Sequence, residues 1–129
     1  MKETKPDILE LNIPNVCFSI VKELDDDDKR LDEYKSQRLE RGFDDTELWN
    51  LDLTLARFLI PRLKVFKEMT ISYPAECESM DDWYEIIDKI IYSMEMIVKD
   101  DDLIIEENKV KEIQVGLDLL GKYFRNLWD

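Results

Sequence analysis

The sequence predicts an all-α protein: a bundle of three long helices preceded by a smaller helical segment. Two observations predict this class. Only 3 of the 129 residues are glycine and 4 are proline, which leaves little of the turn chemistry that a β-rich fold needs. Apolar residues also recur three and four positions apart over long stretches, as in amphipathic helices. We expect the long helices at about 44–69, 80–99 and 104–127, and the smaller segment at about 28–41.

Residues 1–41 are expected to be the least regular part of a single domain that spans residues 1–129. The first fifteen residues contain two prolines and predict an irregular arm, whose candidate anchors are Ile8, Leu9, Leu11 and Ile13. The stretch 28–41 alternates charges of opposite sign around a thin apolar stripe. This pattern predicts a solvated helix that is loosely attached to the body and ends at Gly42.

The first long helix has a well-marked start. Asp44 is a candidate N-cap, Glu47 completes a capping box, and Phe43 and Leu48 occupy the positions of a hydrophobic staple. One face of the helix is apolar and so wide that we expect neighbours on two sides. That face comprises Leu48, Leu51, Leu55, Leu59, Leu63 and Phe66, widened by Trp49, Ala56 and Ile60. Pro61 lies inside the helix and predicts a kink.

Asp52 falls within this apolar stripe. A buried, unpaired carboxylate is costly, so Asp52 is expected to form a buried polar clamp with a partner. The candidate partners are Tyr92, Tyr123, Lys122 and Arg62.

Two further amphipathic stretches follow a connection at 70–78. The expected stripe of the helix at 80–99 is Trp83, Ile86, Ile87, Ile90, Met94 and Ile97. The expected stripe of the last helix is Val110, Ile113, Leu117, Leu120, Phe124 and Trp128. Gly121 falls inside this last stripe and predicts the close approach of a neighbour, such as a tryptophan ring. Phe124, Leu127 and Trp128 near the chain end are candidate apolar anchors for a partner.

The net charge of −13 restricts the kind of molecule that this protein is expected to bind. Such a surface repels nucleic acid, so direct DNA or RNA binding is disfavoured and a basic protein partner is favoured. The expected partner-binding acidic face consists of Asp81, Asp82, Glu85, Asp88, Glu95, Asp100, Asp101, Asp102, Glu106, Glu107 and Glu112. The sequence is also compatible with a homo-oligomer.

The composition also limits the chemistry. There is no histidine, which excludes Ser-His-Asp and Cys-His catalysis. Cys17 and Cys77 lie sixty positions apart and are expected to be reduced thiols. We expect no metal site and no cofactor, since the aspartate runs at 25–28 and 100–102 lack the order of a calcium loop. No apolar run is long enough to span a membrane, and no signal-peptide core is seen, so the expected location is the cytoplasm.

Residues 42–129 resemble a family of small, uncharacterised proteins encoded by tailed bacteriophages. The resemblance rests on the opening Gly42-Phe43-Asp44-Asp45-Thr46-Glu47-Leu48-Trp49-Asn50-Leu51-Asp52 and on Ile60-Pro61-Arg62-Leu63-Lys64. It extends to the ending Gly116-Leu117-Asp118-Leu119-Leu120-Gly121-Lys122-Tyr123-Phe124 with Leu127-Trp128. It implies a phage or prophage gene acting in a bacterial host and supplies no known activity. Residues 1–41 lie outside it.

These observations favour a non-enzymatic phage accessory protein that binds another protein through its acidic surface. Its strongest form is nucleic-acid mimicry directed at a host defence protein. One alternative is a virion or assembly component. Another is a magnesium-dependent all-α nucleotide pyrophosphohydrolase, whose ligands would come from Asp81, Asp82, Glu85 and Asp88, with Asp44 and Glu47 as a weak second pair.

Overall fold

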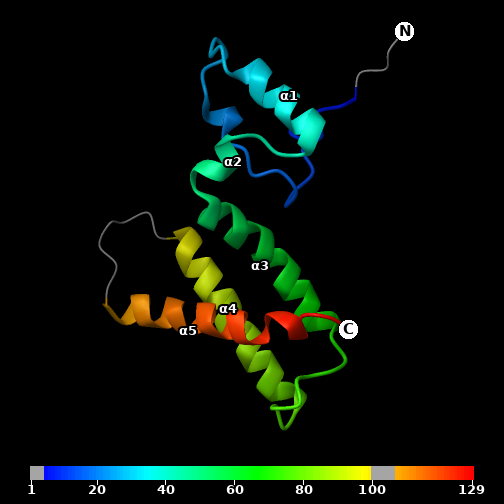
Figure 1. The fold of residues 1–129 in the computed structure, drawn as a ribbon, viewed down its shortest axis with the longest axis vertical. Coiled ribbons are helices and arrows are strands. Elements are labelled where there is room, and N and C mark those ends of the chain that lie inside the picture. Colours follow the sequence, from blue (N-terminus) through cyan, green and yellow to red (C-terminus); the bar gives the residue numbers. More distant parts are fainter. Residues whose placement is uncertain (1–4, 100–106) are drawn as a thin grey trace. The chain divides into compact units, whose positions relative to one another are not determined.

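The computed structural model describes residues 5–99 and 107–129 and confirms the all-α class, with no strand among these residues. The elements are the short 3₁₀ helix η1 (Val21–Glu23), α1 (Leu31–Arg41), α2 (Thr46–Trp49), α3 (Leu51–Met69), α4 (Met80–Lys99), α5 (Glu107–Tyr123) and the 3₁₀ helix η2 (Phe124–Asn126), as labelled in Figure 1. The chain divides into two compact units, Met1–Leu55 and Ala56–Asp129, where we expected one domain with a change of character at residue 41.

In the first unit, α1 ends as predicted at Gly42, whose φ is 88° and whose N–H donates to the carbonyl of Arg38 over 2.9 Å. The prediction of a loosely attached, solvated helix is wrong. Tyr34 and Arg38 on α1 are only 4% and 5% exposed. The arm before α1 is also held differently than expected, because Asp7 is buried whereas Leu11 and Ile13 are about half exposed.

The predicted capping box is present. The amide of Thr46 donates to Asp44 Oδ1 (2.9 Å), and the amide of Asp44 donates to Glu47 Oε2 (2.8 Å). The helix that it starts, α2, is only four residues long, so the prediction of one helix over 44–69 is wrong. Asn50, with φ −127° and ψ 69°, separates α2 from α3. The side chain of Thr54 donates to the carbonyl of Glu47 (2.6 Å) and so satisfies a carbonyl at the end of the short helix.

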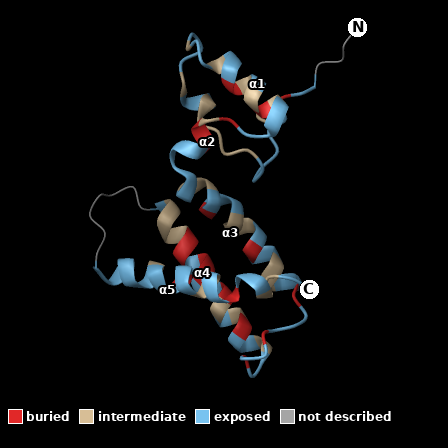
Figure 2. Cartoon of the chain, viewed as in Figure 1, coloured by how far each residue is buried: buried red, intermediate tan, exposed pale blue. Residues whose placement is uncertain are grey.

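The second unit holds the larger apolar core. Seven buried residues form it: Leu63, Cys77, Trp83, Ile87, Ile90, Ile91 and Tyr123. Trp83 lies at its centre, with edge-on ring contacts to Phe66 (6.4 Å between centroids) and Tyr123 (5.7 Å). The stripe predicted for α4 is largely confirmed, since Trp83, Ile87 and Ile90 are buried. Figure 2 shows several buried segments along α4.

The face of α5 that was predicted to point inward is wrong, because the helix is rotated about its axis relative to the prediction. Val110, Phe124 and Trp128 are exposed, whereas Gly116 and Tyr123 are buried. The physical reason is the close approach of Gly116 to Ser93 and Lys89 of α4, which turns a different face inward. Figure 1 shows α5 crossing α4. The expected close neighbour of Gly121 is also wrong, because no atom lies within 4 Å of a Cβ placed there.

Candidate functional site in the groove between α4 and α5

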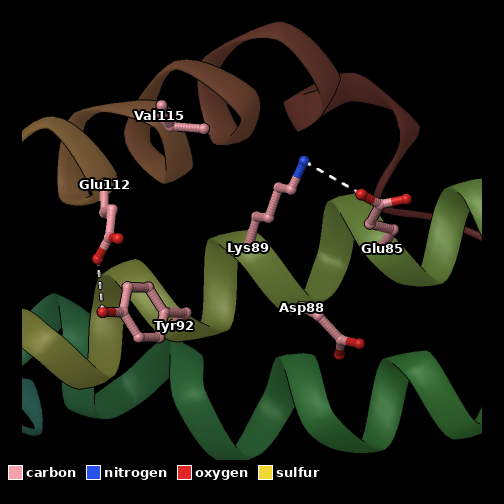
Figure 3. Close-up of a pocket in the computed structure, with 6 residues that line it drawn as sticks. All are labelled: Glu85, Asp88, Lys89, Tyr92, Glu112 and Val115. Atoms are coloured by element: carbon pink, nitrogen blue, oxygen red, sulfur yellow. Dashed lines mark hydrogen bonds and ion pairs between the residues drawn. The ribbon is translucent and has the colours of Figure 1, made fainter.

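A groove of about 500 Å³ runs between α4 and α5 within the second unit (Figure 3). Its lining residues are Glu85, Asp88, Lys89, Tyr92, Glu112 and Val115. Three of these, Glu85, Asp88 and Glu112, were predicted to belong to the acidic face. The crossing of the two helices therefore gathers carboxylates that are up to 27 positions apart in the sequence.

Two interactions order the side chains of the groove. The hydroxyl of Tyr92 donates to Glu112 Oε2 over 2.7 Å and bridges the two helices. Lys89 pairs with Glu85 one turn earlier on α4, at 3.2 Å. Asp88 turns toward α3 in Figure 3, where it pairs with Lys67 at 2.8 Å. The groove itself therefore presents two carboxylates, Glu85 and Glu112, against a single ammonium.

The hydrogen bond to Glu112 raises the pKa of the Tyr92 phenol, since it opposes formation of a second negative charge beside the carboxylate. Tyr92 and Val115 are 40% and 48% exposed and add apolar surface to the walls. An apolar wall that ends in carboxylates suits a long cationic side chain, whose alkyl stem packs while its charged end is paired. Such a groove can accommodate the alkyl stem of a lysine or arginine and pair its charged end.

The rest of the predicted acidic face is dispersed or internally paired. Asp81 and Asp82 are exposed in the first turn of α4, and Asp82 accepts the amide of Glu78 (2.9 Å). Glu95 is half-buried and pairs with Lys64 at 3.0 Å, and exposed Glu107 lies 3.9 Å from Lys111. Asp100, Asp101, Asp102 and Glu106 lie outside the described residues.

The predicted clamp at Asp52 is wrong, because Asp52 is exposed. The break at Asn50 places Asp52 in the first turn of α3, where the helix dipole favours a carboxylate in contact with water. The inward-facing positions of α3 are instead Ala56 and Leu63. Two of the candidate partners of Asp52 bind other carboxylates: Tyr92 donates to Glu112, and Tyr123 donates to Glu76 (2.9 Å).

A buried charge cluster does exist, but in the first unit. Arg38 donates from Nε and Nη2 to the two carboxylate oxygens of Asp7 (2.8 and 2.7 Å) and from Nη1 to Asp44. Ser19 and Thr46 also donate their hydroxyls to Asp44, at 2.6 and 2.5 Å. Every buried side-chain nitrogen and oxygen of the described residues has a hydrogen-bond partner, so this cluster is a fully satisfied structural tie.

The cluster lowers the pKa values of both of its carboxylates. The hydrogen bonds from Arg38 lower the pKa of Asp7. Burial opposes ionisation of Asp44, but the hydrogen bonds from Ser19, Thr46 and Arg38 outweigh it and lower its pKa below 3.8. Sequence reasoning identified Asp44 as a helix cap and as half of a weak metal-ligand pair, and it missed Asp7 and Arg38, although an arginine in the apolar stripe of 28–41 was a usable signal.

The three candidate apolar anchors near the chain end differ in their exposure to solvent. Phe124 and Trp128 are 65% and 70% exposed, whereas Leu127 packs against the core. The last residue is tied to the loop after α3, because Asp129 Oδ1 accepts hydrogen bonds from the hydroxyls of Thr70 (3.0 Å) and Ser72 (3.2 Å). Two of the three side chains are therefore presented to solvent from a fixed backbone.

Among residues 5–99 and 107–129, no three His, Cys, Asp or Glu side chains gather as a metal site would require. Cys17 and Cys77 are free thiols. None of the described helices combines the length and apolar character needed to cross a bilayer. Comparison of the chain with protein-family models, curated proteins and solved structures finds no match.

Proposed function

We propose that this protein acts by binding a basic protein partner and that the groove between α4 and α5 receives a lysine or arginine side chain of that partner. The observation that carries the proposal is a groove between two helices that is lined by the carboxylates Glu85 and Glu112 and by the exposed surfaces of Tyr92 and Val115. The net charge of −13 adds a long-range attraction for a basic surface, which raises the rate of encounter.

The proposed setting follows from the resemblance to tailed-phage proteins. The protein is then a non-enzymatic accessory factor in the cytoplasm of a bacterial host, and a host nucleic-acid enzyme is a fitting target, because such enzymes carry basic clefts. Mimicry of a phosphate row is the strongest form of this proposal. Internal pairing of Asp88 with Lys67, of Glu95 with Lys64 and of Glu85 with Lys89 reduces the density of free carboxylates, so the proposal rests on the apolar walls of the groove together with its charge more than on a row of charges.

Affinity capture from host lysate with matched variants tests the proposal. The tagged wild type is compared with Glu85→Gln/Glu112→Gln, which removes two charges from the groove. The control, Asp25→Asn/Asp26→Asn, removes two charges from exposed positions in the first unit. We expect a basic protein that the wild type and the control retain at low salt and release at high salt, and that the groove variant fails to retain. Equal retention by both double variants would overturn the assignment of the groove.

A role in virion assembly is the second candidate, and one observation favours it. Large apolar side chains stand exposed along α3, and contacts through such residues are insensitive to salt. Recovery of only phage structural proteins, or of the protein itself, would move the conclusion to this role.

A further inference from the structure

The groove between α4 and α5 already holds a cation of its own, the ammonium of Lys89. Lys89 Nζ lies 3.2 Å from Glu85 Oε1, and the side chain of Lys89 is 52% exposed, so the protein covers the rest of it. Figure 3 shows this side chain extending from α4 toward α5 with its ammonium turned to Glu85. One of the two carboxylates that the groove presents is therefore paired before any partner arrives.

The second carboxylate, that of Glu112, is in a different state. Its Oε2 atom accepts the hydroxyl of Tyr92 over 2.7 Å. Within residues 5–99 and 107–129, Tyr92 is the only side chain or backbone group that donates to Glu112, so Oε1 is left for a ligand. The same bond holds the Tyr92 ring, which is 40% exposed, beside that oxygen.

The two carboxylates mark separate positions along the groove. Glu85 and Tyr92 are seven positions apart on α4, which corresponds to about 10 Å along a helix axis. Lys89 lies between them, one turn from Glu85. A single incoming cation therefore meets either the position that Lys89 fills or the position formed by Glu112 and the Tyr92 ring.

We propose that the groove selects an arginine of the partner over a lysine, because Lys89 already fills the position that an ammonium would take. The inference rests on the proposed function and names which cationic side chain the groove receives. It also makes Lys89 the residue that determines this specificity.

A partner lysine gains little at either position. At Glu85 it replaces the Lys89 ammonium, so one ammonium–carboxylate pair is exchanged for another of the same kind. At Glu112 it forms one pair as a compact, strongly hydrated charge and is repelled by Lys89 nearby. The internal cation therefore works against an ammonium at both positions.

A partner arginine gains two interactions at the second position. Its planar guanidinium can donate to Glu112 Oε1 and at the same time lay its face on the exposed Tyr92 ring. The hydroxyl bond to Glu112 Oε2 already fixes that ring, so little freedom is lost when the guanidinium stacks. Repulsion by Lys89 acts on both kinds of cation, but the guanidinium offsets it with a contact that an ammonium makes less well.

The backbone of Lys89 is fixed by the approach of the two helices. A Cβ placed at Gly116 of α5 would lie 2.6 Å from the carbonyl oxygen of Lys89, so this residue stands where α4 and α5 come closest. Its side chain therefore starts at the floor of the groove and reaches Glu85 from there. Removal of the ammonium should free Glu85 for a partner lysine and reduce the preference for arginine.

Titration of the full chain followed by nuclear magnetic resonance tests the proposal. The probes are two capped glycine peptides that differ only in carrying one arginine or one lysine, and the methyl signals of Val115 report binding in the groove. The wild type is compared with Lys89→Met and with the control Lys111→Met. Lys111 pairs with Glu107 one turn earlier on α5, as Lys89 pairs with Glu85 on α4, but does not line the groove. Each substitution therefore changes the net charge equally.

We expect the wild type and the control to bind the arginine peptide roughly fivefold more tightly than the lysine peptide, as one additional exposed charge contact provides. Lys89→Met, with unchanged helical circular dichroism, should bind the lysine peptide more tightly than the wild type does and lose most of the preference. Equal Kd values for the two peptides in the wild type, or a preference that Lys89→Met leaves intact, would overturn the inference while the Val115 shifts still supported the groove. If neither peptide shifted the Val115 signals, the proposed function of the groove would fail together with the inference.

Discussion

Gly116 on α5 packs so closely against Ser93 on α4 that no side chain fits between them. A Cβ placed at Gly116 would overlap the Cβ of Ser93 and would lie 2.6 Å from the backbone carbonyl oxygen of Lys89. Ser93 is fully buried, and its hydroxyl donates to the carbonyl of Ile113 over 2.6 Å. This contact sets how α5 lies across α4 and hence how the walls of the groove face each other.

Gly116→Ala is expected to destabilise the protein by roughly 1–3 kcal/mol, because the added methyl group meets backbone that cannot move aside without shifting a helix. Urea unfolding followed by circular dichroism measures the change. Gly121→Ala on the same helix is the matched control. No atom lies within 4 Å of its added Cβ, so this change should stabilise by up to about 1 kcal/mol through helix propensity. Equal effects at the two positions would contradict the close crossing at Gly116.

Local signals in the sequence were the reliable ones. The capping box of Asp44 and Glu47 and the glycine that ends α1 were predicted correctly, because their partners lie within a few residues. The face of α4 was predicted for a similar reason, since its apolar residues are concentrated on one side. These features depend on backbone geometry that a single segment determines.

The failures arose where distant parts of the chain meet. The rotation of α5 depends on its contact with Ser93, which periodicity within α5 cannot reveal. Asp52 was placed inward on the assumption of an unbroken helix, and the irregular Asn50 removed that assumption. The hydrogen bonds of the Arg38 cluster join residues up to 31 positions apart, and the groove joins α4 with α5, so neither was visible as a pattern in one segment.

Arg38→Met is expected to destabilise the first unit strongly, by about 3–5 kcal/mol, because it leaves Asp7 and Asp44 buried without their cation. Thermal and urea unfolding measure the loss. The control is Arg30→Met, which removes an arginine from the exposed pair that Arg30 forms with Asp28 and should change stability little. A small effect of Arg38→Met would show that the cluster does not hold the arm before α1.

Acid should weaken the first unit in the wild type. The pKa values of Asp7 and Asp44 are lowered in the folded state, so the unfolded chain binds protons first as the pH falls below about 4. The stability that these carboxylates contribute is complete above their ordinary pKa of 3.8 and is lost as the pH falls through their folded values. Urea midpoints measured from neutral pH to pH ~3 should therefore decrease.

Arg38→Met separates this effect from that of other carboxylates. Without the guanidinium, Asp7 loses the largest cause of its lowered pKa and Asp44 loses one of several, so acidification should weaken this part of the chain less than in the wild type. Glu76 in the second unit, whose pKa is lowered by Tyr123 and Lys122, is unaffected by the substitution. Parallel pH profiles for the wild type and Arg38→Met would show that the acid sensitivity originates outside the cluster.

The two thiols allow the unfolding of each unit to be followed separately, because Cys17 belongs to the first unit and Cys77 to the second. Burial raises the pKa of both thiols, so both should react slowly with an alkylating reagent in the folded protein, and the buried Cys77 more slowly than the half-buried Cys17. Arg38→Met should accelerate labelling of Cys17 and leave Cys77 protected, whereas Gly116→Ala should do the reverse. Labelling rates resolved by peptide mass spectrometry test this crossed pattern. If either substitution accelerated both cysteines equally, the two units would unfold as one cooperative structure, and the division at residue 55 would have no energetic meaning.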